Sequence, residues 1–553
     1  MSTLRIPSKP KNSEAKSSQA SKSSSSRDRK RSRDEKDQTE AELETADLVA
    51  FPVRQRKPTL KKPQKKDMSD TPAEEKPQEM KKALQTPGME LLTRIRTGLD
   101  KTPFHVWPIT AQHYYDPKLP RRLVEFTVLF KNILQNEKLT TEACKKLVNE
   151  LVVCDAVADR CAGALTGLAI GDAVGAPLEF IPCDSSLPPY KRKMTRSDTG
   201  RAAWVDPFAL NDKGQLNYPD EYNKFRLLRG QWTDDASMAF AMAESMLVKG
   251  GYNGSDVRIR YFCWWYYGYC NAFRFDSDDQ RTSVGLGGNI SKSIDDLMRF
   301  PGADASKVPA NYEASGEDAG NGSIMRLAPV PIRYHTDINK AMKMAEESSL
   351  ATHPGPDAAV CCRFMTYFIV KAIHRDETTA SATAGQYLDS IVASFLAEHA
   401  GQEKTNTGMA KLFQLLNCSP PSDKEACWDW KQDRMLLEET IKARGSKYNG
   451  YPVMPGYFGS YCMDGLAMAL WALAKSDCFT DCIFKVVNLL GDCDTTGAIA
   501  GQMAGAFYGY TSIASNDFGK RMLEDIHRWD RAYEIELRAL CLNLDAVAEA
   551  SSQ

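Results

Sequence analysis

The sequence contains few of the features that mark exported, membrane-spanning or zinc-binding proteins. No stretch approaches the roughly 18 uninterrupted apolar residues of a transmembrane helix, so we expect no membrane span. Residues 1–30 contain no apolar core, so we expect no secretory signal peptide and an intracellular location, cytoplasmic or nuclear. The 15 cysteines are scattered and show no paired C-x-x-C spacing, which indicates free thiols in a reducing compartment instead of a zinc site.

The sequence also has no strong overall charge. A net charge of −1 over 553 residues gives no bias toward nucleic acid or membrane, and neither is required as a partner. The charge is uneven, however, because residues 1–90 contain 21 Lys and Arg against 15 Asp and Glu. We expect residues 1–100, rich in Ser, Lys and Pro, to form a disordered basic tail. Its basic clusters, at 27–33 and 54–66, are either nuclear localisation or polyanion-binding signals, or a solvated linker.

The remainder of the chain has the pattern of an all-α protein. From about residue 120, apolar residues recur at helical spacing, and no convincing run alternates with the period of a strand. We therefore expect a compact multi-helix domain over 120–545. Small residues within 162–171 predict closely packed helices. Two polar stretches, at about 185–229 and 376–455, have the character of insertions.

Two short acidic motifs each precede an expected helix, GQWTDD at 230–235 and GDCDTTG at 491–497. Helix capping explains one side chain of each motif, and it is the simpler explanation for an isolated TDD. Capping does not explain why two helices each begin with two carboxylates and a threonine. Four carboxylates brought together would repel unless a cation lay between them. Two such sets of oxygen donors could hold two Mg²⁺ ions.

In this order, the two motifs resemble the ADP-ribosylglycohydrolases related to dinitrogenase-reductase-activating glycohydrolase. Other segments resemble the same family, and together they span about residues 155 to 515. These segments are ALTGLAIGDAVGAPLEF at 164–180, SVGLGGN at 283–289 (a weaker match), AGNGSIMRLAPV at 319–330 and THP at 352–354.

The resemblance implies an all-α hydrolase with two Mg²⁺ ions, or Mn²⁺, that releases ADP-ribose from a modified protein or a small-molecule conjugate. Separately, we expect a monomer. The metal ligands that it implies are Thr233, Asp234, Asp235, Asp492, Asp494 and Thr495. Cys493 departs from the small residue more usual in the family, and the two long insertions leave the rim of the cleft open.

Three carboxylates are candidates for acid–base catalysis, because hydrolysis at the anomeric carbon builds oxocarbenium character and uses a carboxylic acid or carboxylate. Asp318 precedes the glycine-rich loop of 319–330, although it could equally cap a turn. Asp235 is a second candidate if it only partly engages metal. Glu179 matches an acidic residue at the lip of the cleft in some members of the family.

Four residues are candidates for substrate binding: Asn321, Gly322, Ser323 and His353. Glycines in GNGS let backbone amides approach phosphate oxygens, although the segment could also be a tight turn before a helix. Arg326 is either a substrate contact or part of a structural ion pair. Three aromatic residues either stack on adenine or belong to the core: Tyr457, Phe458 and Tyr461.

The acceptor implied by the resemblance is ADP-ribosyl-arginine, because residues 319–330 look like the arginine-directed bacterial members. Serine-linked or O-acetylated ADP-ribose is the alternative substrate. A non-catalytic, crystallin-like relative is a further alternative, disfavoured because all six ligand positions carry oxygen donors. The matches at 320–330 and 352–354 disfavour an unrelated binuclear phosphohydrolase.

Overall fold

A computed structural model describes most of the chain after residue 85. The described residues are 86–99, 129–183, 223–273, 283–300, 307–314, 319–376, 382–530 and 532–552. Nearly all of the predicted tail and most of the predicted insertion at 185–229 therefore lie outside the described residues.

The described chain consists of helices and one short hairpin, which confirms the predicted all-α fold. The first half contains the α-helices α2 (Pro87–Leu99), α4 (Leu129–Asn136), α5 (Thr141–Cys154), α6 (Ala156–Gly175), α8 (Asp234–Lys249), α9 (Gly254–Tyr267), α10 (Gly288–Asp296), α11 (Pro329–Tyr334), α12 (Ile338–Leu350) and α13 (Pro356–Ile373). The second half contains α14 (Ala384–Glu398), α15 (Thr407–Leu416), α16 (Leu437–Arg444), α17 (Cys462–Ala474), α18 (Phe479–Val487), α19 (Cys493–Tyr508), α20 (Tyr510–Ser515), α21 (Asp517–His527) and α22 (Glu534–Ser551). Single 3₁₀ turns are η1 (Ala176–Leu178), η2 (Leu297–Arg299), η4 (Asn321–Ser323), η6 (Gln402–Lys404) and η7 (Asp423–Trp428). Strands β1 (Lys447–Tyr448) and β2 (Tyr451–Pro452) pair antiparallel.

Helix α2 corrects the predicted boundary of the tail. The prediction placed residues up to about 100 in a disordered segment, whereas Pro87–Leu99 is helical. Leu92, Ile95 and Leu99 lie on one face of α2 and are buried. They pack in the region of α4, α5 and α22. A short amphipathic stretch inside a polar segment was therefore enough to join the helical domain.

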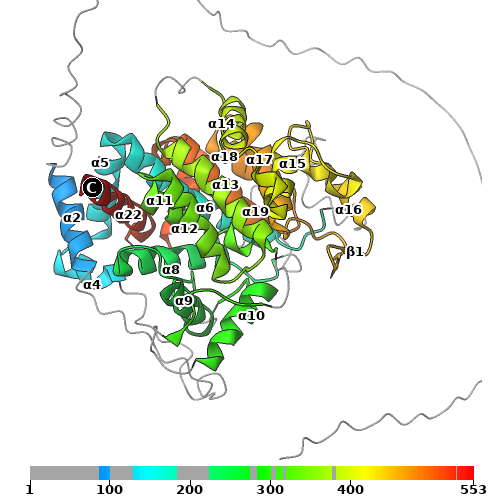
Figure 1. Ribbon diagram of the computed structural model, residues 1–553. Helices are drawn as coiled ribbons and strands as arrows, with labels where there is room; N and C mark the ends of the chain where they lie inside the picture. Colours follow the sequence, from blue (N-terminus) through cyan, green and yellow to red (C-terminus); the bar gives the residue numbers. More distant parts are fainter. Residues whose placement is uncertain are drawn as a thin grey trace, which may run out of the picture. The chain divides into compact units, whose positions relative to one another are not determined.

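Helices α6 and α19 lie side by side in direct backbone contact and run antiparallel (Figure 1). Each helix has a glycine at every fourth position along the shared face, and the glycines of one helix meet those of the other. A Cβ atom on Gly501 would lie 2.1 Å from the carbonyl oxygen of Gly167, so no side chain fits there. This glycine interface consists of the pairs Gly163 with Gly505, Gly167 with Gly501, and Gly171 with Gly497. It confirms the predicted close helix packing.

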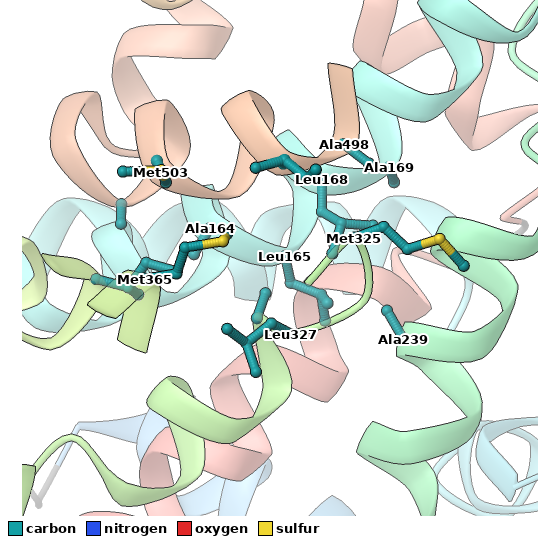
Figure 2. Close-up of a cluster of buried hydrophobic side chains, with 14 of the residues drawn as sticks. Ala164, Leu165, Leu168, Ala169, Ala239, Met325, Leu327, Met365, Ala498 and Met503 are labelled. Carbon is teal, nitrogen blue, oxygen red and sulfur yellow. The ribbon is translucent and has the colours of Figure 1, made fainter. Parts of the chain in front are cut away.

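Helix α6 is enclosed by the other helices of the domain. Leu165 and Leu168 of α6 lie among side chains that include Met503 of α19, Met365 of α13 and Ala239 of α8 (Figure 2). With the turn that follows it, residues Ala156–Leu178 have the length and hydropathy of a membrane-spanning helix, and the 18-residue apolar window within them is completely buried within the domain. Its apolar character therefore serves the core, since a helix that is apolar all round is buried.

The predicted insertion at 376–455 is folded into the domain from residue 382 onward. It forms α14, α15, η7, α16 and the β1–β2 hairpin, whose turn contains Asn449 and Gly450 with positive φ values of 47° and 85°. The Nε1 of Trp428 attaches it to α17 by donating to Asp464 at 3.0 Å, and that of Trp430 donates within the insertion to the Leu415 carbonyl at 3.1 Å. The insertion is thus attached to the first turn of α17, which lies at the cleft described below.

We expect Gly501→Ala to lower the free energy of unfolding by about 1–3 kcal/mol, because the added methyl group would force α6 and α19 apart. Thermal or denaturant unfolding monitored by circular dichroism measures the change. Gly288→Ala in α10 is the matched control, since its Cβ meets nothing within 4 Å. Equal stability of the two variants would contradict the assigned role of the glycine interface.

Candidate active site

The first acidic motif lies at the start of α8 and is held by a carboxylate of α6. Asp172 accepts a hydrogen bond from the backbone N–H of Thr233, 3.0 Å from either carboxylate oxygen, and one from that of Ala236 at 3.0 Å. The Thr233 hydroxyl donates to Asp172 Oδ1 at 2.9 Å and makes no capping bond within α8. Asp172 therefore caps α8 from the neighbouring helix, and the simple explanation that Thr233 caps its own helix is wrong.

The second acidic motif lies at the start of α19. Asp492 occupies the N-cap position without a side-chain capping bond, and its Oδ2 accepts from Asn321 Nδ2 at 2.8 Å. Asp494 Oδ1 accepts from the backbone N–H of Thr495 at 2.8 Å. Capping of α19 therefore does not account for both carboxylates.

The two helix starts meet because the antiparallel packing of α6 and α19 brings the end of α6 against the beginning of α19. A Cβ on Gly175 would lie 2.2 Å from the Cys493 carbonyl oxygen. Two groups of buried carboxylates form at this point, and within each group the potential ligand atoms lie within 4.8 Å of one another. The groups share Asp494: one contains Asp172, Asp235 and Asp494, and the other contains Glu179, Asp492 and Asp494.

Burial without a counter-charge raises the pKa of the carboxyl groups in both clusters. Desolvation, followed by the nearby Asp494 carboxylate, raises the pKa of Asp172 to about 7. Desolvation is also the largest cause for Glu179, Asp235 and Asp494, and neighbouring carboxylates hold the pKa of each well above its usual range. Such a cluster is stable when protons or cations neutralise it.

Two oxygen atoms in the clusters lack partners among the described residues. They are Asp235 Oδ1 and Glu179 Oε2, both buried. An unpaired buried carboxylate oxygen is costly, and a hard cation is a natural partner for it. The donor set, consisting of carboxylate and hydroxyl oxygens, therefore fits divalent cations in both groups.

Asp234 is held by a different neighbour. Gly285 has a φ of +89°, and a Cβ at that position would lie 2.1 Å from Asp234 Oδ1. The loop at 283–289, which gave the weakest sequence match, therefore needs glycine at 285 to pass over this carboxylate.

One segment, residues 456–462, connects the loop before α19 with the substrate loop predicted at 320–323. The Phe458 carbonyl accepts from the Asp492 N–H at 2.9 Å, and the Ser460 carbonyl accepts from the Asn321 N–H at 2.9 Å. Asn321 Nδ2 also donates to the Gly459 carbonyl at 3.0 Å. This segment thereby fixes Asn321 and Asp492 relative to each other, which sequence reasoning did not anticipate.

A cleft of about 1090 Å³ opens above the carboxylates. Predicted ligands on its wall are Asp234, Asp492, Asp494 and Thr495, together with Glu179. Thr233 and Asp235 are buried and are absent from the described lining. That position favours Asp235 as a metal ligand over its second predicted role in acid–base catalysis.

The predicted substrate residues divide between the cleft and the core. Asn321, Gly322 and His353 line the cleft. Ser323 does not belong to the described lining, because its hydroxyl accepts from Ser349 Oγ at 3.0 Å and lies 3.6 Å from Cys362 Sγ. The contacts of Ser323 are those of a core residue, which does not support a substrate contact by its side chain. Asp318 lies outside the described residues and stays a prediction.

Arg326 supports the substrate loop from inside the protein. Its guanidinium donates to the Gly322 carbonyl and to Thr352 Oγ1, the latter at 2.6 Å, and it lies over the Tyr261 ring. Thr352 Oγ1 in turn lies 2.7 Å from His353 Nδ1. Burial lowers the pKa of His353 to about 3, with the Arg326 charge as a second cause, so the imidazole is neutral near pH 7.

The rim of the cleft comes partly from the folded insertion at 382–455. Lys411, Arg444 and residues 448–454 of the hairpin region line it. Of the aromatic residues considered for adenine stacking, Phe458 is buried with Arg444 5.0 Å from its ring centroid. Tyr457 stacks on Phe180 with centroids 5.5 Å apart.

Asp172 is the principal site residue that the sequence reasoning missed. It stands within the quoted segment ALTGLAIGDAVGAPLEF, in which a single charged residue precedes the final glutamate. An aspartate in the buried, largely apolar part of α6 is a recognisable signal, because a buried charge requires a partner.

Comparison with known proteins gives four findings. The family model described as ADP-ribosylglycohydrolase matches residues 154–551. An ADP-ribosylarginine hydrolase, Tri1, of Serratia proteamaculans is 26% identical over 355 residues, covering 64% of this chain and 73% of the relative. The ADP-ribosyl-[dinitrogen reductase] glycohydrolase of Rhodospirillum rubrum is 25% identical over 368 residues, covering 66% of this chain and 90% of the relative. A solved structure named ADP-ribosylglycohydrolase-related protein complex covers 70% of this chain and 99% of its own, with 25% identity and a TM-score of 0.44.

The crowding of carboxylates predicts opposite effects of Asp494→Asn with and without divalent cations. In EDTA, we expect the unfolding temperature to be equal to or above that of the unaltered protein, because one buried like charge is removed. Saturating Mg²⁺ should stabilise the unaltered protein by about 2–3 kcal/mol at 100 times Kd, and the variant far less. The exposed Asp433→Asn is the matched control and should gain like the unaltered protein. Equal gains for Asp494→Asn would contradict a cation site at this carboxylate.

Proposed function

The chain belongs to the ADP-ribosylglycohydrolase family and is a hydrolase, and from this premise we propose that it removes ADP-ribose from arginine side chains of modified proteins with the help of two divalent cations, Mg²⁺ or Mn²⁺. The observation that carries the proposal is the meeting of two buried carboxylate groups that share Asp494 at the base of one cleft. Two adjacent groups with a common carboxylate suit two ions better than one.

The ions would be held by oxygen donors of three helices: Asp172 of α6, Thr233, Asp234 and Asp235 at the start of α8, and Asp492, Asp494 and Thr495 at the start of α19. When bound, divalent ions neutralise the carboxylates, align the ribose hydroxyl groups and favour ionisation of water near neutral pH.

The chain's own residues supply orientation and a proton acceptor. Glu179 lies at the cleft wall, where Tyr457 O–H donates to its Oε1 at 3.2 Å and its Oε2 has no partner among the described residues. We assign Glu179 Oε2 as the acceptor of the proton from the attacking water, with Tyr457 holding the carboxylate in place. Asn321 orients Asp492 through its side-chain amide. The backbone of Gly320 and Gly322 passes close to His353, whose ring a Cβ at either position would meet at 3.2 Å and 2.7 Å respectively.

Arginine is the proposed acceptor because the relative from Serratia proteamaculans is named for hydrolysis of ADP-ribosylarginine, and residues 319–330 carry the motif that suggested the same linkage. Serine-linked or O-acetylated ADP-ribose is the competing substrate. A non-catalytic relative is disfavoured by the complete set of oxygen donors brought together at the cleft.

The deciding experiment incubates the full chain with arginine-ADP-ribosylated and serine-ADP-ribosylated peptides, in Mg²⁺ or in EDTA. We expect release of ADP-ribose from the arginine peptide only with the metal. Asp234→Ala and Asp494→Ala should each lower the rate by more than about 100-fold, because loss of a ligand exceeds the 10–100-fold cost of altering an outer partner. Chromatography of free ADP-ribose gives the rates.

Asp433→Ala, an exposed carboxylate remote from the described cleft lining, is the control and should keep the full rate. Preference for the serine peptide would replace the proposed acceptor while leaving the hydrolase reaction intact. A rate that is insensitive to EDTA and to both substitutions would overturn the metal-dependent mechanism.

A further inference from the structure

The described lining of the cleft carries charges of both signs, unevenly distributed. Carboxylates without a basic partner gather at its base, whereas the only lysine or arginine side chains on the described part of the wall are Lys411 and Arg444, each paired with a carboxylate. Both belong to the folded insertion at 382–455. A substrate that carries both a ribose and a pyrophosphate needs an environment of opposite charge at its two parts, because the diphosphate is repelled by carboxylates.

Arg444 is already fully engaged by the protein. It forms a bidentate pair with Asp464 at 2.6 and 2.9 Å and donates to the Lys424 carbonyl at 2.8 Å. Its guanidinium also lies 3.8 Å from the centroid of the Tyr448 ring, and its side chain is 5% exposed. Arg444 therefore holds the hairpin against α17 and offers little to a ligand.

Lys411 differs from Arg444 in its exposure and in the number of hydrogen-bond donors that remain for a ligand. Its side chain is 37% exposed, and its ammonium donates to Asp357 Oδ2 at 2.7 Å. An ammonium group has three donors, so two remain for a ligand. Tyr461 O–H donates to the same Asp357 oxygen at 2.7 Å. Asp357 thus holds a lysine and a tyrosine side by side on the wall, while Tyr461 also pairs with Gly320 of the substrate loop.

The location of this trio suits the diphosphate part of the proposed substrate. Asp357 stands in the first turn of α13, four residues after His353, and both residues line the cleft. The volume of about 1090 Å³ is at the upper end of ordinary small-molecule sites, which run to roughly 1,000 Å³. A whole ADP-ribosyl group can therefore extend from the carboxylates toward the insertion.

This proposal rests on the proposed function: we propose that Lys411, held by Asp357, binds the pyrophosphate of the ADP-ribosyl substrate, so that the insertion supplies an ammonium group to the cleft. The bound oxygens take the two free N–H donors of Lys411, and the Asp357 carboxylate keeps the ammonium directed along the wall. The insertion is then a determinant of affinity for the diphosphate and not only a structural addition.

Calorimetric titration of the full chain with ADP-ribose, in Mg²⁺, tests the assignment. Lys411→Met should weaken binding about tenfold, the lower end of what a hydrogen bond to a charged group contributes, because the site is partly exposed. Lys411→Arg should restore most of the affinity. Lys431→Met is the matched control, since Lys431 lies in the same insertion, pairs with Asp389 at 2.7 Å and does not line the described cleft.

Asp357→Asn separates phosphate binding from a merely structural ion pair. The asparagine keeps an oxygen that can accept from Lys411 but removes the carboxylate charge that competes with the diphosphate, so the affinity for ADP-ribose should be equal or higher, opposite to Lys411→Met. Equal losses of affinity and unfolding temperature in both variants would instead show that the pair only stabilises the fold, which overturns the assignment. Affinity of Lys411→Met within twofold of the unaltered protein would also overturn it and leave the hydrolase proposal standing. Failure of the unaltered protein to bind ADP-ribose at all would overturn the proposed function itself.

Discussion

The geometry of the site depends on the contact of α6 with α19, in which glycines of the two helices face one another. At these glycine pairs the two backbones meet at distances that a single Cβ would prevent, such as the 2.1 Å that a methyl group on Gly501 would leave to the Gly167 carbonyl. The same antiparallel contact carries Asp172 and Asp494 to one point. A wider helix pair, separated by ordinary side chains, would place these carboxylates several ångströms farther apart. Backbone contact in the core thus sets the spacing of charges at the base of the cleft.

The buried carboxylates destabilise the folded state locally, and the rest of the domain compensates for this. Like charges in an enclosed site raise one another's pKa, as Asp172 illustrates, and oppose folding until protons or cations neutralise them. The surrounding apolar helices and the main-chain bonds of segment 456–462 keep the groups from spreading apart. The protein therefore keeps a destabilising arrangement in place for a ligand, which is the usual relation between stability and a functional site.

Much of the fold and of the site could be predicted from the sequence, because these features depend on local sequence patterns. The helical spacing of apolar residues predicted the all-α domain, and the small residues of α6 predicted close packing. The paired acidic motifs predicted two helix starts rich in oxygen donors, which the structure brings together. The sequence pattern could not show which of these groups would face the cleft. Asp235 and Ser323 occupy motif positions like those of their neighbours, yet tertiary packing turns both away from the described lining.

The remaining features depend on contacts between distant segments and carry little local signal. Asp172 caps a helix that begins 62 residues later, and no rule of local spacing connects the two. The role of segment 456–462 lies in its carbonyl and N–H groups, which every sequence possesses. Helix α2 was assigned to the tail because its few apolar residues stand among many polar ones, and only the neighbouring helices give them a surface to cover.

The use of main-chain atoms by segment 456–462 has an evolutionary consequence. The bonds that hold Asn321 and Asp492 come from the carbonyls of Phe458, Gly459 and Ser460. The side chain of Tyr461, in contrast, faces the cleft and donates to Asp357. Substitutions there can alter what the cleft accepts while the scaffold beneath keeps its geometry. This division means that point mutations can change substrate specificity while the arrangement of the carboxylates stays the same.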